Sequence, residues 1–358
     1  MKSGVLSNVQ ICRAVAALGV VLGHGLHDAG ALEAAPFVNW GAGVDIFFVI
    51  SGFIMVLVAA HSFGAPGEGK RFLARRMVRV APLYWLATTA LLAGAWIAPG
   101  LLNVPIGGWW HVVSSYLFIP DTRPGLDALR PLFALGWTLN YEMLFYVVFA
   151  GEMALPFRFG LGALIALFVA AAAVHVTLPL NYGPFGFWSD PIALEFVLGT
   201  LIGAAYHAGW RMGPRAALAC AAVGFALVNI DVFAALGVTG VPTFLCFGVP
   251  AALMVAGAAL GPQLAGLRAV AWGVTLGDAS YALYLSHPFV IRPLALLWRR
   301  ALGGRAEVAF VAATALICVA VALAVHVWIE RPMTRALVAR LRARHDAAPS
   351  VPAASRLA

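Results

Sequence analysis

Three long stretches of the chain contain no Asp, Glu, Lys or Arg. They cover residues 80–120, 159–189 and 232–267. About 20 apolar residues are enough for a helix to cross the hydrocarbon core of a bilayer, so each stretch has room for one or two spans. The stretches are too long and too rich in Leu and Ala for the short alternating strands of a transmembrane barrel. The sequence therefore predicts an all-α, polytopic membrane protein.

The overall composition excludes the main alternatives. Apolar residues make up 62% of the 358 residues and charged residues only 11%. Soluble proteins carry about 25% charged residues, so this chain has too few to cover a surface that faces water. A soluble enzyme, a disordered chain and a small disulfide-stapled domain are excluded. The net charge of +8 is assigned to basic cytoplasmic loops and not to a nucleic-acid partner.

Ten spans are predicted, separated by Gly and Pro clusters. They cover residues 9–27, 41–61, 80–98, 132–150, 160–179, 190–207, 215–230, 241–260, 271–291 and 308–329. An even number of spans places both termini on one side, and the excess of Lys and Arg makes that side the cytoplasm of a bacterial inner membrane. Residues 1–335 form the membrane domain in this interpretation. Residues 336–358 are basic and are expected to be a disordered cytoplasmic tail that contacts membrane lipid.

Six arginines fall on the outer side in this topology. They are Arg123, Arg130, Arg292, Arg299, Arg300 and Arg305. The Trp-Arg-Arg stretch at 298–300 is the clearest exception to the positive-inside pattern. It indicates either a surface helix or a different number of spans before it.

The first span carries two ionisable residues, Arg13 and His24. A charge at bilayer depth costs at least about 2.5–3.5 kcal/mol, which makes each such residue a candidate site. Eleven residues correspond to three turns within about 20°, so the two side chains share one helix face, roughly 16 Å apart along the axis. The alternative is an arginine that extends to the interface and a histidine that is part of the core.

The second span places Asp45 near the outer face, at about the depth of His24. A carboxylate there can orient the imidazole and raise its basicity, although a solvated carboxylate at a helix start is an alternative. Further along this span, Ser51 and Gly52 are small enough for close helix packing or for the passage of a thin ligand.

Arg76 and Arg79 lie at the start of the third predicted span and share a helix face, being three residues apart. Paired guanidinium groups suit phosphate, although ordinary positive-inside charge explains them as well. Asn140 and Glu142, in the fourth span, are too polar to face lipid and are expected to face a cavity. His287 is predicted near the outer end of the ninth span.

Six motifs then occur in order. They are Arg13 with His24, Phe-Phe-Val-Ile-Ser-Gly at 47–52, Arg-Met-Val-Arg at 76–79, Trp-Thr-Leu-Asn-Tyr-Glu at 137–142, Ser-Tyr-Ala-Leu-Tyr-Leu-Ser-His-Pro at 280–288 and Glu-Arg-Pro at 330–332. Together they resemble the bacterial integral-membrane acyltransferase 3 family, which O-acylates envelope and secreted glycans. The Trp-Thr-Leu-Asn-Tyr-Glu form is similar to the branch that acetylates exopolysaccharide.

The resemblance implies transfer of an acyl group, usually acetyl, from coenzyme A to a hydroxyl of a glycan or lipid-linked glycan. It also implies that Arg13 and His24 are essential and that Arg76 and Arg79 help to hold the donor. We hypothesise that the pantetheine arm passes Ser51 and Gly52 toward His24, which acts as general base or forms an acyl-histidine.

In the same hypothesis Asp45 fixes the imidazole, and Asn140, Glu142 and His287 bind the acceptor. Asn140 or Tyr141 is a candidate donor to the oxyanion. The sequence offers too few ligands for zinc, so no metal is expected. The competing function is a transporter or flippase without acyl-transfer chemistry, in which the buried ionisable residues form a proton or substrate path.

Overall fold

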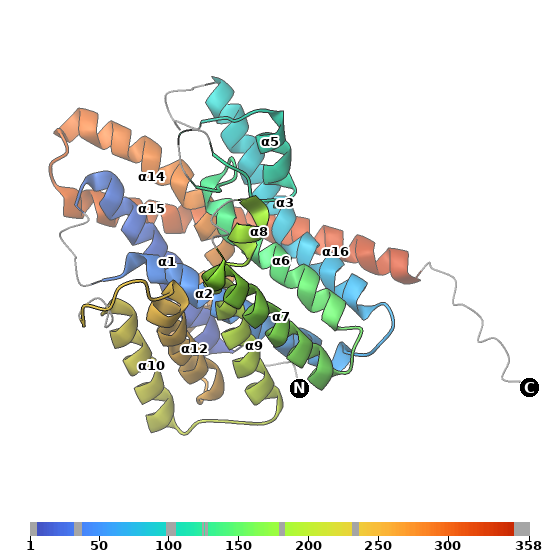
Figure 1. Ribbon diagram of the computed structural model, residues 1–358. Coiled ribbons are helices and arrows are strands. Elements are labelled where there is room, and N and C mark those ends of the chain that lie inside the picture. Colours follow the sequence, from blue (N-terminus) through green and yellow to red (C-terminus); the bar gives the residue numbers. More distant parts are fainter. Residues whose placement is uncertain are drawn as a thin grey trace, which may run out of the picture.

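A computed structural model describes residues 6–31, 38–97, 105–123, 125, 128–178, 183–230 and 236–346. All regular structure in these residues is helical, apart from one isolated antiparallel bridge between Thr122 and Leu129. The predicted all-α fold is confirmed for this part of the chain. The helices form a bundle from which the last one, α16, extends to one side (Figure 1).

The helices follow one another along the chain, with the longest connection between α5 and α6. They are α1 (Ser7–Ala29), α2 (Gly43–Ala59), α3 (Glu68–Ile97), α5 (Trp109–Tyr116), α6 (Trp137–Glu152), α7 (Phe157–Thr177), α8 (Gly183–Trp188), α9 (Leu194–His207), α10 (Pro214–Asn229), α12 (Val249–Leu260), α13 (Arg268–Asp278), α14 (Ser280–Leu302), α15 (Glu307–Val325) and α16 (Arg331–Asp346). Two π-helical segments, Phe244–Gly248 and His326–Glu330, precede α12 and α16.

Each of the ten predicted spans contains a helix. Five helical stretches are long and apolar enough to cross a membrane: Ser7–Ala29, Trp40–Ser62, Glu68–Ile97, Phe157–Thr177 and Glu307–Ala343. Large apolar side chains such as Leu218, Val308 and Leu316 stay more than 70% exposed, as expected where helices face lipid. The membrane-protein class is confirmed, whereas ten spans and cytoplasmic termini remain predictions.

Three predicted boundaries are wrong. The third helix begins at Glu68 and not near residue 80, so Arg76 and Arg79 lie inside it. The ninth range is broken at Ala279 between α13 and α14, and α14 continues through residues 298–300 to Leu302. The predicted disordered tail begins too early, because residues 336–346 belong to α16, which packs on α3. Residues 347–358 lie outside the described part.

Glycines set the close approach of α2 and α9. A Cβ atom at Gly52 would lie 2.0 Å from the carbonyl oxygen of Phe196, and one at Gly199 would lie 2.0 Å from that of Val49. Neither position accepts a side chain without moving a backbone, as in other membrane helix pairs packed through small residues. Of the two roles expected for Gly52, the structure supports close packing.

A glycine also allows α1 to pack closely against α13. A Cβ atom at Gly277 would lie 2.1 Å from the carbonyl oxygen of Gln10, so the two backbones nearly touch. Helix α1 also packs on α2, α14 and α15. These contacts hold α1 in the bundle, where Arg13 is half-buried and His24 is exposed.

Candidate active site

One cavity of about 140 Å³ lies between α1, α2, α3, α6 and α14. Five of the predicted site residues line it: Arg13, Ser51, Arg76, Arg79 and Glu142. They come from four helices and are separated by up to 129 positions in the chain. The sequence motifs therefore converge on one space, whose walls are otherwise mostly apolar.

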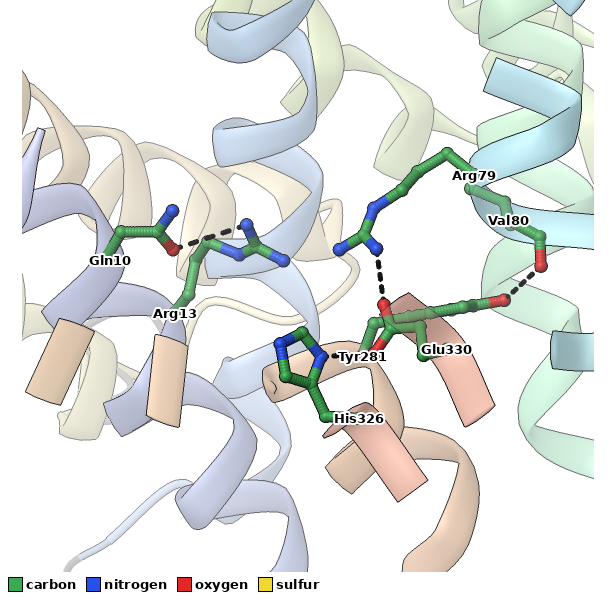
Figure 2. A network of polar contacts seen from close by, with 7 residues as sticks. All are labelled: Gln10, Arg13, Arg79, Val80, Tyr281, His326 and Glu330. Carbon is green, nitrogen blue, oxygen red and sulfur yellow. Dashed lines mark hydrogen bonds and ion pairs between the residues drawn. The ribbon is translucent and has the colours of Figure 1, made fainter. Parts of the chain in front are cut away.

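Arg79 is held by a chain of polar contacts. Its guanidinium forms an ion pair with Glu330 at 2.5 Å, and the other carboxylate oxygen of Glu330 lies 2.7 Å from Nδ1 of His326. Figure 2 shows this chain, with Arg13 reaching toward Arg79 from α1. The Glu330 side chain is fully buried, which a carboxylate tolerates only with such partners.

His326 and Glu330 lie at the two ends of the π-helical segment His326–Glu330, so His326 holds the carboxylate that pairs with Arg79. A π-turn widens the helix locally and is frequent at functional sites. Nearby, the hydroxyl of Tyr281 donates to the carbonyl oxygen of Val80 at 2.8 Å and fixes α14 to α3 (Figure 2). The sequence marked Glu330 only as part of a motif, and it gave no signal that His326 belongs to this network.

Arg13 and Arg76 are less well neutralised. Neither forms an ion pair among the described residues; Arg13 has a single long hydrogen bond of 3.4 Å to Gln10, and Arg76 lies over the Phe72 ring at 5.7 Å. Nε of Arg76 is buried without a hydrogen-bond partner in this part of the chain. The cavity is therefore a positively charged space that suits an anionic ligand.

Glu142 provides the negative group of the cavity. Its Oε1 accepts a hydrogen bond from Ser51 Oγ at 2.6 Å and a second from the hydroxyl of Tyr146, one turn along α6. Ser51 is thus a partner of Glu142 as well as a lining residue. Tyr146 was missed by the sequence analysis, although its spacing of four from Glu142 places it on the same helix face.

Two other predicted residues lie away from the cavity. Asn140 is fully buried, and neither its amide oxygen nor its nitrogen has a partner among the described residues. Tyr141 stacks on Phe187 with ring centroids 4.2 Å apart. Neither residue lines the cavity, because residues 140 and 141 point from α6 in directions other than that of Glu142.

The expected pairing of Asp45 with His24 is wrong. The carboxyl group of Asp45 lies next to that of Glu195 at the contact between α2 and α9. His24 is instead oriented by its own helix, since its Nδ1 lies 2.9 Å from the carbonyl oxygen of Val20. The sequence predicted Asp45 and His24 at the same depth in the membrane, but depth alone does not determine whether two side chains on different helices face each other.

His24 and His287 form a pair, with ring centroids 5.0 Å apart. His287 repeats the arrangement of His24: its Nδ1 lies 3.2 Å from the carbonyl oxygen of Leu283, four residues earlier. A carbonyl only accepts, so both rings carry their proton on Nδ1 and present Nε2 as an acceptor. His24 is exposed, whereas His287 is fully buried and its Nε2 has no partner in the described chain.

The cavity ends short of the histidines. Its lining within the described chain includes Phe47 and Tyr284, whose rings are in edge contact at 6.4 Å, but neither histidine. Tyr284 lies between the two features, with its ring 6.1 Å from that of His287. The open passage from the arginines to His24 that the sequence analysis expected is not seen in the described chain, since the cavity lining reaches Tyr284 but neither histidine.

The fold and the site combine a bundle of apolar helices, a cavity lined by three arginines and a pair of neighbouring histidines. Residues 6–328 match the model of a family described as an acyltransferase domain. The chain belongs to this acyltransferase 3 family and is an O-acyltransferase, as its motifs predicted. Membership of this enzyme family argues against the competing function, a transporter without acyl-transfer chemistry.

Two relatives extend over most of the chain. The exopolysaccharide production protein ExoZ of Rhizobium meliloti is 36% identical over 304 residues, which cover 84% of this chain and 91% of the relative. Acyltransferase MdmB of Streptomyces mycarofaciens is 30% identical over 332 residues, which cover 82% of this chain and 81% of the relative. No solved structure matches the chain.

Proposed function

We propose that this enzyme moves an acyl group, usually acetyl, from acyl-coenzyme A to a sugar hydroxyl of an exopolysaccharide or another envelope glycan. The acceptor class is supported by the similarity to ExoZ, a protein of exopolysaccharide production. The donor class is supported by the cavity, where the guanidinium groups of Arg13 and Arg76 lack ion-pair partners among the described residues. That cationic cavity is the observation that carries the proposal.

The arginines bind the anionic part of the donor in this scheme. Arg76 and Arg79 approach from one face of α3 and Arg13 from α1, so phosphate oxygens between them accept hydrogen bonds from two sides. Glu142 balances this charge when the donor is absent. Its hydrogen bonds from Ser51 and Tyr146 keep the carboxylate at the wall of the cavity.

His24 acts as the general base. Its Nε2 takes the proton of the sugar hydroxyl while the hydroxyl oxygen attacks the thioester carbonyl carbon, and the imidazolium then returns the proton to the departing sulfur. His287 is suited to assist, because its buried Nε2 can accept a hydrogen bond from the imidazolium. An acyl-histidine intermediate on the same Nε2 is the alternative route, and a stable labelled enzyme after incubation with radioactive acyl-coenzyme A alone would favour it.

Reaction requires that the acyl end of the donor pass Phe47 and Tyr284. Both rings line the cavity on the side of His287, so a rotation of either side chain would join the cavity to the histidine pair. In the proposed topology, with ten spans and both termini in the cytoplasm of a bacterial inner membrane, the arginines take the donor from the cytoplasm. The glycan then reaches His24 from the opposite side.

The test compares two histidine variants in purified protein reconstituted in liposomes. His24→Gln should abolish acyl transfer from acetyl-coenzyme A to unacylated glycan from the source organism, because Gln cannot take the proton. His175→Gln is the matched control, since His175, on α7, bonds Ser189 and lies away from the site. Full transfer activity in His24→Gln would refute the catalytic role, and a wild-type protein indifferent to acetyl-coenzyme A would refute the proposed function.

A further inference from the structure

Three arginines gather at the end of the bundle that holds the histidine pair. Arg123 and Arg130 belong to the segment between α5 and α6, and Arg292 lies on α14. Arg292 and Arg130 are close enough for their charges to act on Arg123: burial first, and then these two arginines, lower the pKa of the Arg123 guanidinium. None of the three forms an ion pair within the described residues.

Backbone contacts hold the described residues around Arg123 and Arg130. Beside the bridge between Thr122 and Leu129, the backbone N–H of Arg123 donates to the carbonyl oxygen of Ala128 at 3.3 Å and that of Arg130 to the carbonyl oxygen of Asp121 at 2.9 Å, so the two arginines lie diagonally across the bridge. The Asp121 carboxylate accepts from Ser114 and from the backbone of Thr122, so it is not a counter-ion for either arginine.

The Arg130 side chain is fixed as well. Its guanidinium lies 4.5 Å from the centroid of the Trp137 ring, and its carbonyl oxygen is 3.0 Å from Nε2 of His111. Stacking on an aromatic face leaves the edge of a guanidinium available for hydrogen bonds. Nε of Arg123 is buried and has no partner in the described chain, which adds a second unused donor.

This cluster is separate from the donor cavity. Tyr284 is the last residue of α14 in the cavity lining, and Arg292 follows it by eight residues, which is about 12 Å along a helix. Arg130 lies near Tyr284, whose ring contacts His287. The cluster therefore stands on the histidine side of the reaction centre, where the acceptor must approach.

We propose that Arg123, Arg130 and Arg292 bind an anionic group of the acceptor glycan, either a sugar carboxylate or the diphosphate of a lipid-linked glycan. This inference rests on the proposed function and specifies its acceptor. Guanidinium groups that have no ion-pair partner in the described chain can recognise oxygen anions by paired hydrogen bonds, and both candidate groups present such oxygens. A neutral sugar would leave these donors unpaired.

The experiment uses unacylated glycan from the source organism lacking this chain, separated into a lipid-extractable and a polymeric fraction. Each fraction is offered untreated, after reduction of its carboxylates, and after mild acid, which cleaves the sugar diphosphate. We expect one treatment to raise the KM of the wild-type enzyme for the acceptor about tenfold, the scale of one lost charge-assisted contact. The effective treatment identifies the anion.

Arg292→Gln is the decisive variant, because Arg292 is exposed and its loss leaves the packing intact. It should raise the KM for untreated acceptor about tenfold, leave the KM for treated acceptor and for acetyl-coenzyme A unchanged, and be partly rescued by Arg292→Lys. Arg300→Gln, farther along the same helix and also exposed, is the control and should change nothing.

Several results would overturn the proposal. One is a wild-type KM for the acceptor that neither treatment changes. Another is an Arg292→Gln variant whose KM rises equally for treated and untreated acceptor. A third is a rise in KM that disappears in liposomes without anionic lipid, which would identify a lipid headgroup as the ligand. Absence of any transfer by the wild-type enzyme would instead refute the proposed function, and with it the assigned acceptor site.

Discussion

The ion pair between Arg79 and Glu330 predicts a specific pattern of stability in a double-mutant cycle. The two partners are unequally exposed: the side chain of Arg79 keeps 34% of its accessible surface and that of Glu330 keeps none. Arg79→Met therefore strands a buried carboxylate that retains only His326. Glu330→Gln leaves a cation that can still turn toward water.

The exposed fractions of the two side chains determine the expected loss of stability in each variant. Removing one partner of a fully buried pair costs about 3–5 kcal/mol, whereas an exposed pair is worth about 1 kcal/mol or less. Since Arg79 is one third exposed, we discount the first range and expect Arg79→Met to cost about 3 kcal/mol and Glu330→Gln about 1 kcal/mol. The double variant carries no stranded carboxylate, so it should be about 1–2 kcal/mol more stable than the sum of the single costs implies.

The assay is equilibrium unfolding of the purified proteins in detergent, followed by circular dichroism of the helices. A coupling of about 1–2 kcal/mol is a five- to thirtyfold effect on the folding equilibrium, well within reach of such a measurement. Costs that add to within about 0.5 kcal/mol would refute the pair as a stabilising contact. An Arg79→Met variant that is more stable than Glu330→Gln would refute the burial argument itself.

Three further predictions address packing, donor binding and donor length. Gly199→Ala places a Cβ atom against the Val49 carbonyl oxygen, so we expect a loss of about 1–3 kcal/mol of unfolding free energy in the same assay, and an unchanged value would contradict the close α2–α9 contact. Arg76→Lys removes a guanidinium fork and should raise the KM for acetyl-coenzyme A about tenfold with little change in kcat; a change in kcat alone would argue against a donor-binding role. Phe47→Ala opens the wall between the cavity and the histidines, so activity with butyryl-coenzyme A relative to acetyl-coenzyme A should rise about tenfold, the worth of two buried methylenes, and equal selectivity would show that the ring does not limit the acyl chain.

Much of the fold follows from the sequence because lipid leaves the backbone few choices. A chain inside hydrocarbon must satisfy its own N–H and C=O groups, so long apolar runs can only be helices. Charge patterns carry less information about helix ends. Helix α3 extends far beyond its apolar part because Phe72 packs against Phe149 and Gly69 against Ala150, contacts that a local hydropathy pattern does not contain.

The site was partly predictable for a related reason. An ionised group in an apolar helix is costly wherever it faces lipid, so Arg13, Arg76 and Glu142 could be selected as candidate site residues, although the sequence assigned Arg76 to the donor and Glu142 to the acceptor and the structure places them around one cavity. Partnerships across helices were not predictable in this way. Glu330 and Arg79 are 251 residues apart, and Asp45 meets Glu195 rather than His24, because rotation of one helix about its axis decides which neighbour a side chain faces.

The two binding sites that we propose divide the arginines without an ion pair in the described chain into two groups. Arg13 and Arg76 line the cavity, whereas Arg123, Arg130 and Arg292 lie outside its lining. A partly buried guanidinium without a counter-ion is less stable than a paired one, so each group gains most when its anion binds. In the proposed scheme His24 and His287 act between the two groups, and each ring is held by a carbonyl of its own helix, which leaves its Nε2 as an acceptor. The scheme thus separates charge recognition at the two ends from proton transfer in the middle, so that two anionic substrates meet at His24 without sharing a binding site.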